Sequence, residues 1–288
     1  MKKSRVAIQG GPASFHDAAA RQLLPGMPLE VAHCDTFSSL CVALQQGETD
    51  AAVMAIENTL AGSLLLNYSL LQEHRLHITA ELWLSIDQNL MALPGQRIAD
   101  IRTVSSHPVA LAQCKGFLQR HPHLQPQVTH DTADSAKAIQ EQGLMATAAI
   151  AGKAAAELYG LEILAENIAD SLQNHTRFLL LQREQPEVPA DADKAIVVFR
   201  KPLHTSTLTL LLSLLQKHQV ELTLLQTLPA GEGRAQLVAE VEAPHVSHLQ
   251  QAIAQVRPLV EDLQVLGILK QAARPQTSTV TKETAAIL

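Results

Sequence analysis

A polar segment that runs directly into an apolar strand narrows the possible folds of this chain more than any other part of it. Residues Phe178 to Leu181 form a continuous apolar run, which is typical of a strand buried on both faces of a parallel sheet. Thr176 and Arg177 come just before that run. The backbone would hold both side chains at the mouth of the strand, within reach of a ligand. The alternative is a turn, with Arg177 paired to a carboxylate inside the protein.

The composition excludes several kinds of protein. The chain has 288 residues, 47% hydrophobic and 17% charged, with a net charge of −6. This length suits two domains, and an acidic chain without a Lys/Arg run is not expected to bind nucleic acid. The first residues contain too short an apolar stretch for a signal peptide, and no segment approaches the roughly 20 apolar residues that span a bilayer. We therefore expect a cytoplasmic protein without a membrane partner.

The cysteines and histidines do not predict a metal centre. Cys34, Cys41 and Cys114 are odd in number and form no CxxC pair, so reduced thiols are expected. None of the 13 histidines occurs in an HExxH or paired Cys/His spacing. We expect neither a metal nor a cofactor.

The first sixty residues predict a β-α-β-α-β unit. Strands are expected over 5–9, 31–33 and 51–56, with helices over 15–24 and 36–46. Such a unit folds as a parallel sheet with helices on both faces, and ligands bind beyond the carboxyl ends of its strands. The loop at 10–14 and the triplet Glu57-Asn58-Thr59 are both expected at that edge.

A second α/β unit follows a helix over 63–73 and extended chain over 77–93. Its strands are expected near 103–105, 127–129 and 146–150, and its helices over 109–120, over 132–142 and after Gly152. Ser106 and His107 precede Pro108, which suits a first helical turn. They either cap the helix or leave its amide groups free to hold a carboxylate. If the strand after 174 returns to the first unit, two crossovers enclose a cleft.

Five motifs in this order resemble the prephenate dehydratase family across about residues 5–182. They read GGPASFHDAA, AVMAIENTLAGS, SSHP, AAELYGLEIL and NHTRFLLL. The resemblance implies a periplasmic-binding-protein-like (type II) pair of subdomains with the active site in their cleft. It also implies conversion of prephenate to phenylpyruvate, carbon dioxide and water. Ala13 departs from the family pattern, where a glycine is common, and so does His16, where a small hydroxyl residue is frequent.

The resemblance also assigns roles to residues. Thr176 matches the family's proposed donor to the leaving hydroxyl, as a positioned donor or relay helped by a neighbour or water. Arg177 is expected to pair with the side-chain carboxylate of the substrate, or instead to form an internal ion pair. Glu57 is expected to orient Arg177 or a backbone amide. The catalytic set is therefore Thr176, Asn58 and Arg177, and the substrate-binding set is Ser14, Glu57, Thr59, Ser106 and Phe178.

Residues after 183 predict a separate module. A linker is expected over 184–194, followed by strands and helices in the β-α-β-β-α-β order of a ferredoxin-like fold over 195–272 and a disordered tail over 273–288. Position and order resemble an ACT domain, which implies phenylalanine bound between two subunits of a homodimer or homotetramer. The effector-site motifs are altered here, so feedback is left open, and the matching positions are Ser206, Thr207, Leu208 and Gln226.

The sequence leaves four functions open. The first is a prephenate dehydratase with subdomains over 1–80 with 166–183 and over 81–165. An arogenate dehydratase would use the same cleft on the amino analogue of prephenate. A non-catalytic amino-acid-sensing module and a dehydratase-like regulator are further alternatives.

Overall fold

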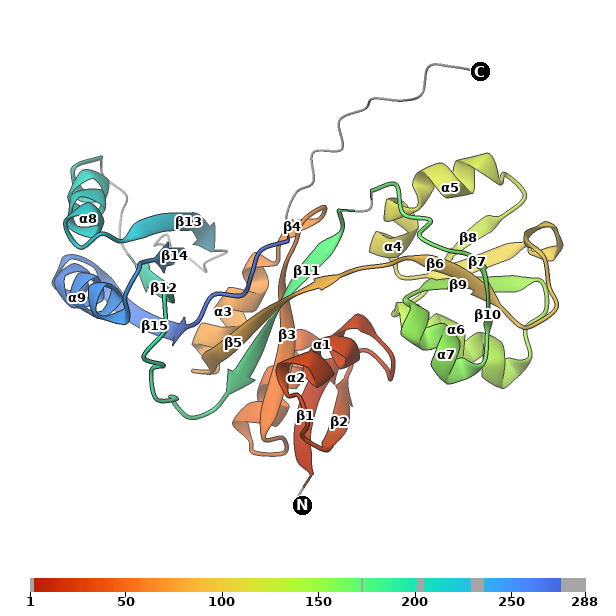
Figure 1. Ribbon diagram of the computed structural model, residues 1–288, viewed down its shortest axis with the longest axis horizontal. Coiled ribbons are helices and arrows are strands. Elements are labelled where there is room, and N and C mark those ends of the chain that lie inside the picture. The colour runs from red at the N-terminus through yellow and green to blue at the C-terminus, as the bar shows by residue number, and fades with distance from the viewer. Residues whose placement is uncertain (1–2, 172, 201–204, 229–235, 276–288) are drawn as a thin grey trace.

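The computed structural model describes residues 3–171, 173–200, 205–228 and 236–275. Three sheets lie in a row in Figure 1, with the C-terminal module at the left and the second lobe at the right. The first lobe has the strand order β2-β1-β3-β11-β5, and β4 pairs with β3. Its elements are β1 (Ser4–Gln9), α1 (Phe15–Leu23), β2 (Leu29–Cys34), α2 (Phe37–Gln45), β3 (Ala51–Asn58), β4 (Gly62–Ser63), α3 (Leu65–Glu73), β5 (His77–Ser85) and β11 (His175–Gln182).

The second lobe contains a sheet with the order β10-β6-β9-β7-β8. The chain enters this lobe after β5 and leaves it after β10, so two crossovers join the lobes. The single helix expected over 109–120 is two helices that meet at Cys114. The elements are β6 (Asn89–Ala92), η1 (Ile98–Asp100), β7 (Thr103–Ser106), α4 (Pro108–Gln113), α5 (Lys115–Arg120), β8 (Gln125–Val128), α6 (Thr132–Gln142), β9 (Thr147–Ala151), α7 (Lys153–Tyr159) and β10 (Glu162–Ala165).

Strand β11 is an inner strand of the first sheet, between β3 and β5, and runs antiparallel to both neighbours. The expectation that this strand lies in a parallel sheet is therefore wrong, whereas the predicted β-α-β-α-β unit is parallel, with β1 pairing parallel to both β2 and β3. The apolar run is buried on both faces, as expected, because different modules cover the two faces. Phe178 and Leu180 pack with the α1 side of the first lobe, whereas Leu179 and Leu181 pack with residues of the C-terminal module.

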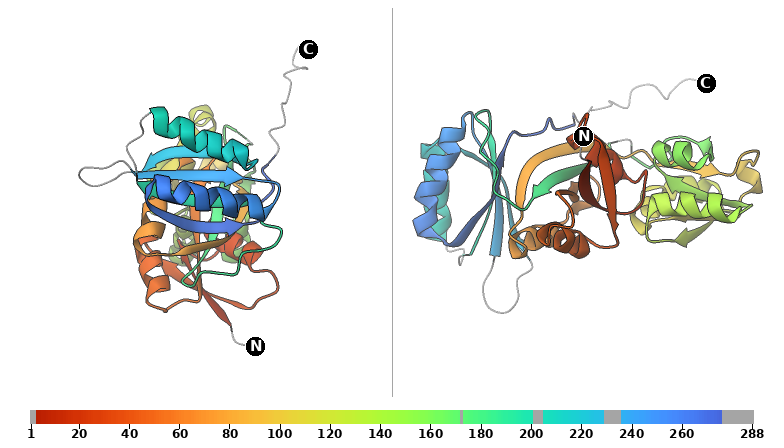
Figure 2. Two further views of the ribbon diagram at one scale, coloured as in Figure 1. Left: turned by 90° about the vertical axis from the view of Figure 1, so that its left-hand side faces the viewer. Right: turned by 90° about the horizontal axis from the view of Figure 1, so that it is seen from below.

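The C-terminal module has the β-α-β-β-α-β element order expected from the sequence. Its antiparallel sheet has the order β13-β14-β12-β15. Figure 2 shows α8 and α9 on the outer side of this sheet, while the opposite face lies against the first lobe. The elements are β12 (Lys194–Arg200), α8 (Thr205–Lys217), β13 (Glu221–Leu228), β14 (Gln236–Glu242), α9 (Val246–Val256), η2 (Arg257–Leu259) and β15 (Glu261–Leu269). Most of the expected tail, 276–288, lies outside the described residues.

Three general features concern the chemistry available to the protein. The three cysteines are free thiols. Within the described ranges, no helix combines the length and apolarity needed to cross a bilayer. In the same ranges, no three His, Cys, Asp or Glu side chains are grouped in a way that could hold a metal ion.

Candidate active site

A cavity of about 360 Å³ is lined by residues from both lobes. The first lobe contributes side chains that follow β1 and β3 and side chains on β11. The second lobe contributes the start of α4 and of α6. The lining residues that carry polar groups are Gln9, Ser14, His16, Asn58, Gln88, His107, Gln113, His130, Asp131, Thr132 and Thr176.

Thr176 and Asn58 form the most constrained polar pair in this cleft. The Asn58 Nδ2 donates to Thr176 Oγ1 at 2.9 Å and to Asn174 Oδ1 at 2.8 Å. The Asn58 Oδ1 accepts from the backbone N–H groups of Leu60 and Ala61, which fixes the orientation of the amide. Because Thr176 Oγ1 already accepts a hydrogen bond, its own proton is left to donate to a ligand.

The pairing of β3 with β11 explains why Asn58 faces the cleft. Asn58 lies opposite Thr176 and Glu57 opposite Arg177, but the register shifts so that Phe178 lies opposite Ala55. Ile56 is therefore an extra residue on β3, a bulge that re-aims the side chains after it. Residues directly opposite each other on paired strands share a face, so Asn58 and Thr176 point into the cleft together.

Two helices begin at the cleft with their own side-chain caps. Ser14 is buried and its Oγ accepts from the Asp17 N–H at 3.3 Å at the start of α1. Asp131 Oδ1 accepts from the N–H groups of Ala133 and Asp134 at 2.8 and 3.1 Å at the start of α6. Burial raises the pKa of Asp131, while these backbone hydrogen bonds act in the opposite direction. The positive ends of both helices favour an anionic group nearby.

The Gly10-Gly11 loop allows the two lobes to approach each other beside the cleft. A Cβ at Gly10 would lie 2.6 Å from Asp131 Oδ2, and one at Gly11 would lie 2.5 Å from Asp134 Oδ1. Gly10 also has a φ of +86°, a conformation that suits glycine. A larger residue at either position would have to displace the carboxylate of Asp131 or Asp134.

Arg177 does not line the cleft, contrary to the expectation that it contacts a substrate carboxylate. Its guanidinium forms a bidentate pair with Glu240 of the C-terminal module, Nη1 to Oε2 at 2.8 Å and Nη2 to Oε1 at 2.6 Å. Glu57 and Glu81 each lie 3.2 Å from it. The internal ion pair, which the sequence left open, is what the structure contains, and Glu57 contacts Arg177 as expected.

This buried cluster joins the first lobe to the C-terminal module. Lys194 Nζ lies 3.0 Å from both Glu81 and Glu240, and the Tyr68 hydroxyl donates to Glu240 Oε1 at 2.6 Å. Burial alone would raise the pKa of Glu240, but the hydrogen bonds and charge of Arg177, with the charge of Lys194, lower it to about 2. Glu240 is therefore ionised at neutral pH, as a paired buried carboxylate should be.

Three further predicted substrate-binding residues do not line the cavity. Glu57 lies with Arg177 on the far side of the sheet. Thr59 is exposed, and its Oγ1 donates to the Gln173 carbonyl at 2.8 Å. Ser106 is fully buried and donates to the Ile150 carbonyl at 2.6 Å. Of the predicted set, the structure brings together Ser14, Asn58, Thr176 and Phe178.

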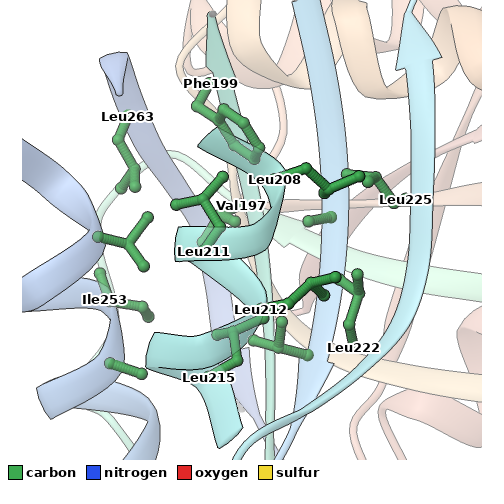
Figure 3. Close-up of a pocket in the computed structure, with 14 residues that line it drawn as sticks. Val197, Phe199, Leu208, Leu211, Leu212, Leu215, Leu222, Leu225, Ile253 and Leu263 are labelled. Carbon is green, nitrogen blue, oxygen red and sulfur yellow. The ribbon is translucent and has the colours of Figure 1, made fainter. Parts of the chain in front are cut away.

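The four positions matched to an effector site have different surroundings. Leu208 lines an apolar cavity of about 50 Å³ between α8, α9 and the sheet, and Figure 3 shows its side chain among those of Leu211, Leu225 and their neighbours. Ser206 is exposed, and Thr207 and Gln226 are half-buried. A cavity with an almost entirely apolar wall provides no partner for the charged groups of a free amino acid.

Sequence reasoning did not assign several cleft residues to the site. Gln9, Gln88 and Gln113 line the cavity, and Gln113 Oε1 accepts from Asn174 Nδ2 at 2.8 Å. His16 also lines it, although the sequence marked this residue only as a departure from a pattern. The available signal was position, because Gln9 is the last residue of β1 and His107 lies between the end of β7 and the start of α4.

The structure is that of a two-lobed α/β protein, in which two crossovers join the lobes and polar side chains from both lobes line the cavity between them. The family model described as prephenate dehydratase matches residues 6–186. The chain therefore belongs to the prephenate dehydratase family.

Relatives agree with this assignment, and their names give either arogenate alone or both arogenate and prephenate as the substrate. Arogenate dehydratase 5, chloroplastic, from Arabidopsis thaliana is 37% identical over 285 residues, which is 91% of this chain and 66% of the relative. The chain thus spans about two thirds of that relative's length.

Solved structures resemble the chain over nearly its whole length. A prephenate dehydratase from Arthrobacter aurescens in complex with L-Phe is 28% identical with a TM-score of 0.82, covering 93% of this chain and 90% of that one. GqqA, described as a novel type of quorum quenching acylase, is 32% identical with a TM-score of 0.81, covering 92% and 97%.

Proposed function

We propose that this chain is a prephenate dehydratase in which Thr176 donates the proton to the leaving hydroxyl. The observation that carries the proposal is the Asn58–Thr176 pair on the cleft wall, where the amide nitrogen donates to Oγ1 at 2.9 Å. This hydrogen bond orients the hydroxyl and leaves its proton for the substrate. Family membership and the two-lobed cleft support the same reaction.

The chemistry requires little acid strength from the protein. The bond between the ring and its carboxylate breaks, and its electron pair completes the aromatic ring as carbon dioxide leaves. The bond between the ring and the hydroxyl breaks with its electron pair on oxygen, which takes one proton to form water. A weak acid held at the leaving oxygen suffices because aromatisation drives the reaction. Phe37, Ile86 and Phe178 give the cleft an apolar wall, which favours loss of a neutral product.

Arogenate is the second candidate substrate, and the charge of the cleft favours it. Among the described lining residues there is no Lys or Arg, and Asp131 carries the one carboxylate. Asp131 Oδ1 is used by two backbone N–H groups, whereas the cap leaves Oδ2 free to pair with an ammonium group. Prephenate has no ammonium group, whereas its amino analogue does.

The test is turnover of both substrates by the purified chain, with Thr176→Val and Thr176→Ser alongside. Valine keeps the shape of threonine without the hydroxyl, so we expect kcat to fall by about 10² or more, while serine keeps most of the activity. Asp131→Asn distinguishes the two substrates, because this substitution should lower the turnover of arogenate and leave the turnover of prephenate unchanged. A folded parent that converts neither substrate would refute the proposal and favour the binding-module alternative.

We also propose that the C-terminal module is an ACT domain through which the chain forms a homodimer. The element order and the position after the catalytic lobes support this. Because Leu208 lines an apolar cavity and the effector-site motifs are altered, we expect no L-phenylalanine feedback. The turnover assay with saturating phenylalanine tests this, and inhibition would show that an effector site exists.

A further inference from the structure

The imidazole of His16 lies on the cleft wall with an unused hydrogen-bonding position. His16 is the second residue of α1 and lines the same cavity as Thr176. Its Nε2 is buried and has no hydrogen-bond partner among the described residues. Buried polar atoms are nearly always paired in folded proteins, so this nitrogen calls for an explanation.

Aromatic contacts fix the position of the ring. The His16 ring meets that of Phe178 edge to face, with centroids 5.0 Å apart and planes at 84°, and it lies 5.6 Å from the Phe37 ring. Phe178 is two residues after Thr176 on β11, and side chains two residues apart on a strand share a face. His16 is therefore held beside the position at which a ligand would contact Thr176.

The imidazole is neutral at physiological pH. Desolvation by burial lowers the pKa of His16 to about 4. A neutral imidazole carries one N–H donor and one acceptor nitrogen. It can therefore donate to a substrate oxygen in this cleft without a second buried charge.

We infer that His16 contacts the substrate and donates a hydrogen bond to the same leaving oxygen that Thr176 protonates. The inference rests on the proposed function and adds a residue to that site. As the bond between ring carbon and oxygen breaks, the oxygen takes the electron pair and the proton of Thr176. The His16 N–H stabilises the charge that develops on this oxygen, and Thr176 regains a proton from solvent.

The decisive variant is His16→Phe, because phenylalanine preserves the ring contacts with Phe37 and Phe178 and removes both nitrogens. We expect kcat to fall by about 10², the scale for loss of one donor to a developing oxyanion, with KM changed much less. The melting temperature at pH 7.5 should be unchanged or higher, since an unpaired buried nitrogen is removed. His16→Gln supplies an amide N–H donor and should recover at least about tenfold of the lost kcat.

Several results would overturn the inference. Parental kcat in a folded His16→Phe variant would mean that the ring only packs. Equal losses in the phenylalanine and glutamine variants would show that shape matters rather than the donor, and a change confined to KM would place His16 away from the reacting oxygen. The parent is assayed first with prephenate and arogenate. Its inactivity on both would refute the proposed function itself, whereas an active parent confines any failure to His16.

Discussion

Arg177 and Thr176 are neighbours in the chain, yet their surroundings are opposite. Thr176 lines the cleft, whereas the Arg177 side chain is 2% exposed and is held by carboxylates from two modules. Its Nε has no partner among the described residues, so the guanidinium depends on Glu240 and its neighbours for compensation. Removing one member of such a buried cluster leaves the others unpaired, which costs more than the loss of an exposed pair.

We predict that Arg177→Met lowers the free energy of unfolding by about 3–5 kcal/mol, because Glu240 and Glu81 then share only Lys194 as a buried cation. Urea unfolding of the purified variant measures this change. Arg200→Met is the matched control, since Arg200 pairs with Asp262 at 3.3 Å on the surface and such pairs contribute roughly 1 kcal/mol or less. Equal effects of the two substitutions would contradict a structural role for the cluster.

Strand alternation shows what the sequence could have predicted about Arg177. Consecutive strand residues point to opposite faces, so Thr176 and Arg177 cannot both face one ligand. The expectation that both contact the substrate conflicted with this rule and could have been excluded. The partners of Arg177 could not have been predicted, because Glu240 and Lys194 belong to strands whose packing against β11 has no local sequence signal.

At the scale of elements, most strands and helices follow from local patterns. The expected helix over 132–142 coincides with α6, and the C-terminal module has the predicted order of strands and helices. The direction of β11 could not be predicted from the sequence pattern, because an apolar run is compatible with both parallel and antiparallel pairing. The break between α4 and α5 at Cys114 was also missed, although Gly116 lies only two residues after it.

Strand β14 carries a carboxylate that should make stability depend on pH. The folded-state pKa of Glu240 is lowered to about 2 from its ordinary value of 4.5. Its contribution is therefore fully present above about pH 4.5 and is lost as the pH falls toward 2. We predict that the difference in unfolding free energy between the parent and Glu240→Gln shrinks across this window. Urea unfolding at a series of pH values tests it, and a difference that stays constant between pH 4.5 and pH 2 would contradict the assignment.

At the scale of the whole molecule, the C-terminal module and the first lobe share one hydrophobic core. Met54 and Leu179 from the lobe pack in the same cluster as Val198, Val238 and Leu266 from the module. The buried ions at Arg177 lie within this interface. The module is thus part of the support for β11, the strand that presents Thr176, and changes in their packing should reach the cleft.

Gly267 on β15 of the C-terminal module packs closely against the first lobe. A Cβ at this position would lie 2.5 Å from the Ile78 carbonyl oxygen and 2.9 Å from the Ile78 Cβ, on β5 of the first lobe. Because the nearer obstacle is a backbone carbonyl oxygen, the two strands must separate to admit even a methyl group. We predict that Gly267→Ala lowers the free energy of unfolding by about 1–3 kcal/mol, the usual cost of overpacking. Gln264→Ala is the control, because Gln264 lies on the same strand and its side chain is half-buried. Both variants are measured by urea unfolding, with turnover assayed in parallel.

If Gly267→Ala unfolds like the control, close packing of β15 on β5 does not stabilise the protein. If it unfolds earlier and kcat also falls while the control keeps both, the interface supports the strand that carries Thr176.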